Sequence, residues 1–205
     1  SATLGALPAP PEAAMRHLAL DVIRDEHQAL AAMLRSLSLL LQQSRREGRP
    51  PPFDVLRAML FYIDEFPERL HHTKESELLF PKVRARAPEL APVLEKLERD
   101  HVAGERAIRE LEHLLLAFEV MGEPRRQAFE AAAERYIASY LEHMAREEAD
   151  IIPAARRLLS EADWAELDAA FAANKDPLTG HEPEDGYRPL FRQIVNNAPA
   201  PIGLA

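Results

Sequence analysis

The sequence contains no cysteine, an absence that excludes disulfide bonds, thiolate metal sites and a cysteine nucleophile. Glycine is also scarce, at 7 of 205 residues, whereas apolar residues make up 47%. This composition favours helix over sheet, and the length is sufficient for one domain with a sizeable core. No apolar run approaches the roughly 20 residues needed to span a bilayer.

The charge pattern narrows the choice of partners. The formal net charge is −9, and acidic and basic residues are intermixed along the chain, which argues against a surface that binds nucleic acid. The first 14 residues lack the basic and apolar regions of a signal peptide. Together with the absence of cysteine, these features favour a cytoplasmic protein with neither nucleic acid nor membrane as a partner.

Four long amphipathic segments follow one another, each ended by helix-breaking residues. The prolines at 50–52 and Gly122 mark two breaks, and Ser160 followed by EAD is typical of a capping box. Short connections make neighbouring helices antiparallel, so we predict an all-α, up-down four-helix bundle. The predicted helices are 12–46, 53–86, 89–120 and 124–158, preceded by a leader at 1–11. The remainder, 159–205, is predicted to hold a short helix at 160–173, another from Tyr187 and an extended tail.

Two stretches of the sequence repeat one pattern of side chains at an offset of 72 residues. Residues 70–81 read LHHTKESELLFP, and residues 142–153 read EHMAREEADIIP. A shorter echo, DEHQAL at 25–30 and RDHVAG at 99–104, relates the other two helices at an offset of 74. Two helix pairs of like pattern suggest a pseudo-two-fold bundle in which the two halves of one site meet. Pro67 lies inside the second helix and is predicted to kink it just before His71.

Each long helix places one histidine within its apolar stripe, and three helices carry a glutamate four residues later on the same face. An ionised carboxylate buried without a partner is strongly unfavourable, and a pair of cations would satisfy several such groups at once. Imidazole with carboxylate suits iron, and also manganese or zinc, whereas the lack of thiolate disfavours copper(I) and iron–sulfur clusters. The predicted metal ligands are His27, His71, Glu75, His101, Glu105, His143 and Glu147.

Each of these signals also has an ordinary structural interpretation. A single histidine on an apolar face is usually a hydrogen-bonded core residue, and an H-x-x-x-E pair is a common ion pair on helix surfaces. The joint placement, one histidine per helix together with the repeated motif, favours metal binding. His72 lies about 100° around the helix from His71 and is predicted to support the site or to lie at the bundle edge. The histidines predicted to be solvated are His17, His113 and His181.

Over about residues 17–158 the sequence resembles the hemerythrin-like family, also called the HHE cation-binding family. The two H-x-x-x-E-x-x-x-[LI]-[FI]-P stretches match its signatures for the second and fourth helices, and the single histidines of the other two helices match its spacing. The resemblance implies a non-haem centre of two iron ions, bridged by carboxylates and by an oxo or hydroxo oxygen. Carried over by position, it assigns as ligands His27, His71, Glu75, His101, His143 and Glu147.

The sequence departs from the oxygen-carrying members of that family at two places. They have a second histidine one turn after the histidine of the third helix, where this chain has Glu105. They also have H-x-x-x-x-D on the last helix, where this chain has His143 and Glu147. More carboxylates and fewer histidines lower the potential of a di-iron site and disfavour reversible oxygen carriage. The pattern is closer to the family's iron–sulfur repair and nitric-oxide-responsive proteins, whose N-terminal cysteine-containing segment this sequence lacks.

We therefore expect a di-iron protein that meets O2, NO or H2O2 at iron, for binding, sensing or detoxification, with no side chain acting as a catalytic acid or base. The alternative is an iron-handling or iron-sensing module whose output is a contact between its C-terminal tail and a protein partner. A metal-free scaffold is a third interpretation, and it requires the inward glutamates to be protonated or hydrated.

Overall fold

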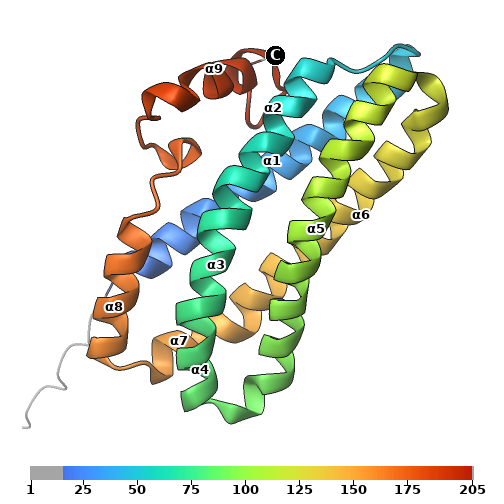
Figure 1. The fold of residues 1–205 in the computed structure, drawn as a ribbon. Helices are drawn as coiled ribbons and strands as arrows, with labels where there is room; N and C mark the ends of the chain where they lie inside the picture. Colours follow the sequence, from blue (N-terminus) through green and yellow to red (C-terminus); the bar gives the residue numbers. More distant parts are fainter. Residues whose placement is uncertain (1–15, 205) are drawn as a thin grey trace, which may run out of the picture.

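Long helices dominate the computed structural model, which describes residues 16–204. No strand occurs among these residues, and the prediction of an all-α protein is confirmed. Figure 1 shows four long helical rods side by side, with a short connection between each rod and the next. None of the described helices is both long and apolar enough to cross a membrane. The predicted leader at 1–11 and the predicted helix start at residue 12 lie outside the described residues.

The four rods differ in their regularity. The first and third are single helices, α1 (Leu18–Glu47) and α5 (Ala91–Met121). The second and fourth contain π-helical segments, in which backbone hydrogen bonds span five residues instead of four. The second rod comprises α2 (Phe53–Ile63), a π-helical segment (Asp64–His71), α3 (His72–Lys74), another π-helical segment (Glu75–Leu79) and α4 (Phe80–Arg86). The fourth comprises α6 (Arg126–Arg146), a π-helical segment (Glu147–Ile151) and α7 (Ile152–Leu158).

Prolines accompany the π-helical segments. Pro67 lies inside the segment Asp64–His71, and Pro81 and Pro153 each follow a π-helical segment by two residues. A proline has no N–H, so the carbonyl four residues earlier loses its α-helical partner. A wider turn accommodates that loss without ending the helix. The kink predicted just before His71 thus takes the form of a stretch of π-helix.

Two apolar clusters occupy the two ends of the bundle and leave a polar layer between them. The larger cluster includes Leu34 of α1 and Phe118 of α5, and the smaller includes Ile23 of α1 and Leu97 of α5. Each of these helices therefore passes from one cluster to the other. The histidine predicted as a ligand on each helix, His27 on α1 and His101 on α5, lies at that crossing.

The helix that follows the fourth rod completes the smaller cluster. α8 (Glu161–Ala172) packs against α1, as Figure 1 shows, and buries Trp164 and Phe171 in that cluster. Its start is the predicted capping box, confirmed by the hydrogen bond from the N–H of Asp163 to Ser160 Oγ and by its reciprocal. Residues beyond the fourth rod thus contribute to the core.

The short helix predicted from Tyr187 is present as α9 (Arg188–Asn197), but the last described residues fold onto the bundle, so the prediction of an extended tail is wrong. α9 packs against α2 and buries Phe191 in the larger apolar cluster. Beyond α9, Ser36 Oγ donates a hydrogen bond to the carbonyl of Pro199 (2.8 Å) and accepts one from the N–H of Ile202 (3.2 Å). Burial of apolar side chains such as Phe191 favours the packing of this segment against the bundle.

A buried carboxyl group in the loop after α8 should make stability depend on pH. Asp176 accepts hydrogen bonds from the Tyr62 hydroxyl (2.5 Å) and from the N–H of Leu178 (2.9 Å). Burial nevertheless raises the pKa of Asp176 from 3.8 to about 6. Between those two values the folded chain keeps a proton that the unfolded chain releases. The free energy of unfolding of the metal-free protein should therefore fall as pH rises through this window, by on the order of 3 kcal/mol.

Asp176→Asn should remove this slope, because an amide does not ionise. We expect the stability of the variant relative to wild type to increase with pH, on top of a pH-independent loss of about 1 kcal/mol for one missing hydrogen bond. Urea denaturation of the metal-free proteins from about pH 4 to about pH 8 measures the difference. Asp185→Asn, which alters an exposed carboxylate nearby, is the control and should keep the wild-type slope. Parallel curves for D176N and wild type would contradict the prediction.

Candidate metal centre

The polar layer between the two apolar clusters gathers six of the seven predicted ligands. All six side chains are buried, and both glutamates have no exposed surface. They come from all four rods, so the layer forms only when the bundle closes. These residues are His27, His71, Glu75, His101, His143 and Glu147.

Glu75 lies at the centre of the layer and faces histidines from three rods. Its Oε1 atom is 2.6 Å from Nε2 of His71 and 3.6 Å from Nε2 of His27. Its Oε2 atom is 3.3 Å from Nε2 of His101. One carboxylate therefore stands between histidines of α1 and of α5, the position that a bridging ligand would occupy.

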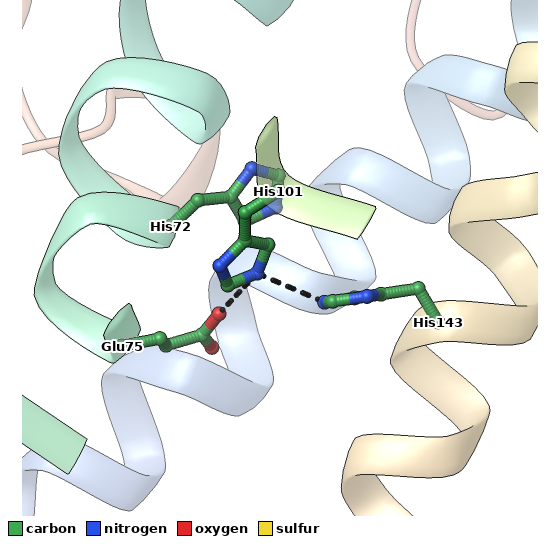
Figure 2. Close-up of side chains that lie close together, drawn as sticks. All are labelled: His72, Glu75, His101 and His143. Atoms are coloured by element: carbon green, nitrogen blue, oxygen red, sulfur yellow. Dashed lines mark hydrogen bonds and ion pairs between the residues drawn. The ribbon is translucent and has the colours of Figure 1, made fainter. Parts of the chain in front are cut away.

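Glu147 spans the same layer from the fourth rod. Its Oε2 atom is 3.7 Å from Nε2 of His27 and 3.7 Å from Nε2 of His143. The potential donor atoms fall into two groups close enough for a metal ion, and Glu75 belongs to both. Figure 2 shows the group in which His101 lies between Glu75 and His143, whose Nε2 is 3.0 Å from that of His101.

The outer nitrogens of the four predicted histidine ligands have oxygen partners on neighbouring rods. His27 Nδ1 is 3.0 Å from Glu148, and His101 Nδ1 is 2.7 Å from the hydroxyl of Ser76. A histidine that donates its Nδ1–H to oxygen keeps the Nε2 lone pair for a metal, and the contact fixes the orientation of the ring. The same sense of pairing recurs at His143 Nδ1, 3.3 Å from Asp100, and at His71 Nδ1, 3.5 Å from Glu26.

These oxygen partners were not predicted, although they sit beside predicted ligands in the sequence. Glu26 and Asp100 precede the histidines of α1 and α5, and Ser76 and Glu148 follow the two buried glutamates. The pairing repeats between the two halves: α1 supports the second rod as α5 supports the fourth. The predicted pseudo-two-fold pattern is thus present in the contacts around the site. The repeated acid–histidine dipeptides, EH and DH, were the signal in the sequence.

The electrostatics of the layer leave several polar atoms without partners. Among the described residues, eight buried side-chain atoms have no hydrogen bond, and six of them belong to His71, Glu75 and Glu147. Burial opposes the charge of Glu75, but the neighbouring His71 lowers the pKa of Glu75 well below its usual value. Burial, with the charge of Glu75, raises the pKa of Glu147 well above its usual value. Unpartnered carboxylate and imidazole donors in this number fit a site for iron, manganese or zinc.

Glu105 is the one predicted ligand that the structure does not bring to the layer. Its side chain is 54% exposed and accepts a hydrogen bond from Arg109 (2.7 Å). The buried positions of α5 follow a seam in which Gly104, three residues after His101, faces inward. Glu105 is the fourth residue after His101. It falls on the flank of that seam because four residues of an α-helix make more than one full turn. The expectation that Glu105 points into the core is therefore wrong.

His72 is more central than the sequence suggested. Only 3% of its surface is exposed, and it belongs with Glu75, His101 and His143 to one of the two groups of potential donors. Its Nδ1 atom is 3.2 Å from Oε2 of Glu68, a buried carboxylate that also accepts a hydrogen bond from a tyrosine hydroxyl. Both rings of the HH pair thus reach the layer, helped by the π-helical segment that ends at His71.

The remaining histidines lie away from the layer. His113 and His181 are exposed, as predicted. His17 is only partly exposed, because its ring stacks on Trp164 of α8 at a centroid distance of 4.1 Å.

Comparison with known proteins gives one match of wide extent. Residues 18–155 match the sequence model of the hemerythrin HHE cation binding domain. This span includes the first three rods, the fourth rod as far as Ala155 and the whole polar layer. A search of curated proteins found no match. Because the match covers more than half of its length, the chain belongs to the hemerythrin HHE cation-binding domain family.

Proposed function

We propose that the chain binds two iron ions in the polar layer and there binds or reacts with a small molecule, O2, NO or H2O2. The observation that carries this proposal is the set of six buried nitrogen and oxygen atoms on His71, Glu75 and Glu147 that make no hydrogen bond with any described residue. The potential donors of the layer also form two groups that share Glu75, which supports two ions rather than one. A cation pair would compensate the carboxylates that the fold otherwise buries at a cost.

Bound iron would supply redox chemistry and an open coordination position for the small molecule. The chain itself supplies the imidazole donors and the two carboxylates that reach both halves of the site. Contacts such as that between His27 and Glu148 orient the donors, and the two apolar clusters exclude water from either side. Because burial and Glu75 favour the protonated form of Glu147, that carboxyl group would release a proton as the cation binds.

A surface pocket near one group of potential donors supports this proposal. This pocket of about 190 Å³ between α5 and α6 is lined by residues that include Gly104 and Tyr140. A Cβ atom on Gly104 would lie only 1.8 Å from the Tyr140 hydroxyl, so glycine makes room for that tyrosine. On its inner side the Tyr140 ring stacks on His72 at 4.9 Å. The Tyr140 ring therefore lies between this pocket and His72, and a diatomic molecule or peroxide that enters here would need the ring to move.

A second candidate function, iron sensing through a protein partner, is favoured by a different observation. Asn174, just after α8, donates a hydrogen bond from Nδ2 to Oε1 of Glu26 (3.0 Å), and Lys74 donates one to its Oδ1. Glu26 Oε2 in turn lies 3.5 Å from His71 Nδ1. The C-terminal segment therefore contacts the predicted ligand His71 through a single intervening side chain, that of Glu26. In this function, loss of iron would loosen that contact and expose the segment to a partner.

One set of measurements tests both candidates. Purified protein should contain about two irons per chain, and stopped-flow mixing of the reduced protein with O2, NO or H2O2 should give a fast absorbance change of one equivalent per site. Limited proteolysis after residue 172, with and without iron, follows the C-terminal segment. Gas or peroxide reactivity with unchanged proteolysis favours the first function. Iron-dependent cleavage without such reactivity favours the second, and a protein that binds no iron contradicts both.

A further inference from the structure

We propose that His72 is a metal ligand, a fifth imidazole that binds the same ion as His101 and His143. This inference rests on the proposed function, because it assigns a further donor to one of the two proposed ions. It gives the site five histidines and two glutamates, with the additional histidine supplied by the second rod rather than by position 105 of the third.

The position of the ring supports this assignment. His72 stacks on His101 at a centroid distance of 4.4 Å with planes 17° apart, and its centroid is 5.9 Å from that of His143. One potential donor atom from each of these histidines and one from Glu75 all lie within 4.8 Å of one another. Figure 2 shows the three rings and the carboxylate converging from three different rods.

The outer contact of His72 has the same chemistry as those of the predicted ligands. A carboxylate oxygen of Glu68 lies 3.2 Å from His72 Nδ1. In the same way, Glu148 faces Nδ1 of His27, and Asp100 faces Nδ1 of His143. Glu68 is itself held by the hydroxyl of Tyr136 at 2.6 Å. A carboxylate on Nδ1 selects the tautomer that offers Nε2 to a metal. A histidine that served only to fill the core would not need this anchored carboxylate, which is costly to bury.

Because Glu105 points outward, the third rod provides only one donor to the layer. The third rod offers His101 but turns the next potential donor into solvent, where it pairs with Arg109. The ion near His101 and His143 would otherwise have only those two imidazoles and the shared carboxylates. The ring of His72 lies against His101, on the side where a further donor is needed.

Iron titration of wild type and His72→Gln tests the assignment. Glutamine retains an amide that can contact Glu68 but is a poor donor to iron. Wild type should bind two irons, and H72Q should bind one of them with affinity reduced by more than the roughly 10–100-fold that loss of an outer partner costs. His113→Gln, which changes an exposed histidine, is the matched control and should bind two irons with wild-type affinity.

Two further measurements separate ligation from a structural role. His72→Gly should regain the second iron when millimolar imidazole is added, and X-ray absorption at the iron edge should then show the imidazole scattering restored. Circular dichroism of the metal-free variants checks that the helices persist. If H72Q binds two irons with unchanged affinity and an unchanged absorption spectrum, His72 is not a ligand and the proposed function stands. If wild type itself binds fewer than two irons, both proposals fail.

Discussion

Replacing Glu75 with glutamine is expected to abolish binding of both iron ions, from two per chain to fewer than about 0.2 after dialysis. Glu75 belongs to both groups of potential donors, and its two oxygens face histidines on three rods. No other side chain of the layer has that double role in such close contact. An amide has the shape of the carboxylate but neither its charge nor its basicity, so each ion loses an anionic donor at once. Iron analysis after reconstitution measures the effect.

The matched control for this prediction is Glu77→Gln. Glu77 lies two residues further along the same rod, in the same π-helical segment, and is exposed. We expect E77Q to bind two irons with wild-type affinity, which would show that the loss in E75Q does not come from the helix or from net charge. Retention of two irons by E75Q would refute a bridging role for this carboxylate. Retention of one would mean that Glu75 serves a single ion.

Iron should raise the midpoint of thermal unfolding by roughly 10–20 °C. Two sites filled at about a hundred times their dissociation constants add about 5 kcal/mol to the free energy of unfolding. For a domain of this size each kcal/mol shifts the midpoint by about 2–4 °C. The physical source is local, because the metal would give partners to the buried oxygens of Glu75 and Glu147, which have no hydrogen bonds among the described residues. Differential scanning calorimetry of chelated and iron-loaded protein measures the shift.

E75Q again provides the control for this measurement. Its midpoint should not respond to iron, and its metal-free form should remain folded, because glutamine keeps the shape of a buried carboxyl group that makes no hydrogen bond with any described residue. A wild-type midpoint that is the same with and without iron would show that the layer is stable in its own right. Such a result would favour the metal-free scaffold over both proposed functions.

Periodicity and spacing predicted the helices and the six residues that meet in the layer. Apolar stripes, proline breaks and the capping box are local signals, and each appears in the structure near its predicted place. The errors concern the rotation of side chains around the helix axis. Glu105 was placed inward by assuming that the fourth residue after a histidine always shares its face, and His72 was placed aside by the same reasoning. Which side chains share a face depends on whether the local turn is α-helical or π-helical, and the sequence did not reveal this.

Contacts between rods were beyond the reach of a single sequence. Nothing local to Glu26 indicates that it supports His71 on another rod, or that Asn174, almost 150 residues away, donates to it. The packing of α9 was missed for a related reason. The helix itself was predicted, but its apolar residues are few and follow a loop rich in proline and charge, so no local signal indicated its contact with α2.

The π-helical segments limit how far this protein could be redesigned. Backbone idealisation would replace each widened turn by a regular α-helix of the same length. The tighter α-helical turns would wind the same residues further around the axis and rotate every later side chain. After Glu75 and Glu147 this rotation would turn the buried Leu79 and Ile151 toward solvent and bring polar neighbours into the core. Regularising these two rods would remove apolar side chains from the smaller cluster next to the polar layer. The π-helical turns are therefore needed for the packing around the site.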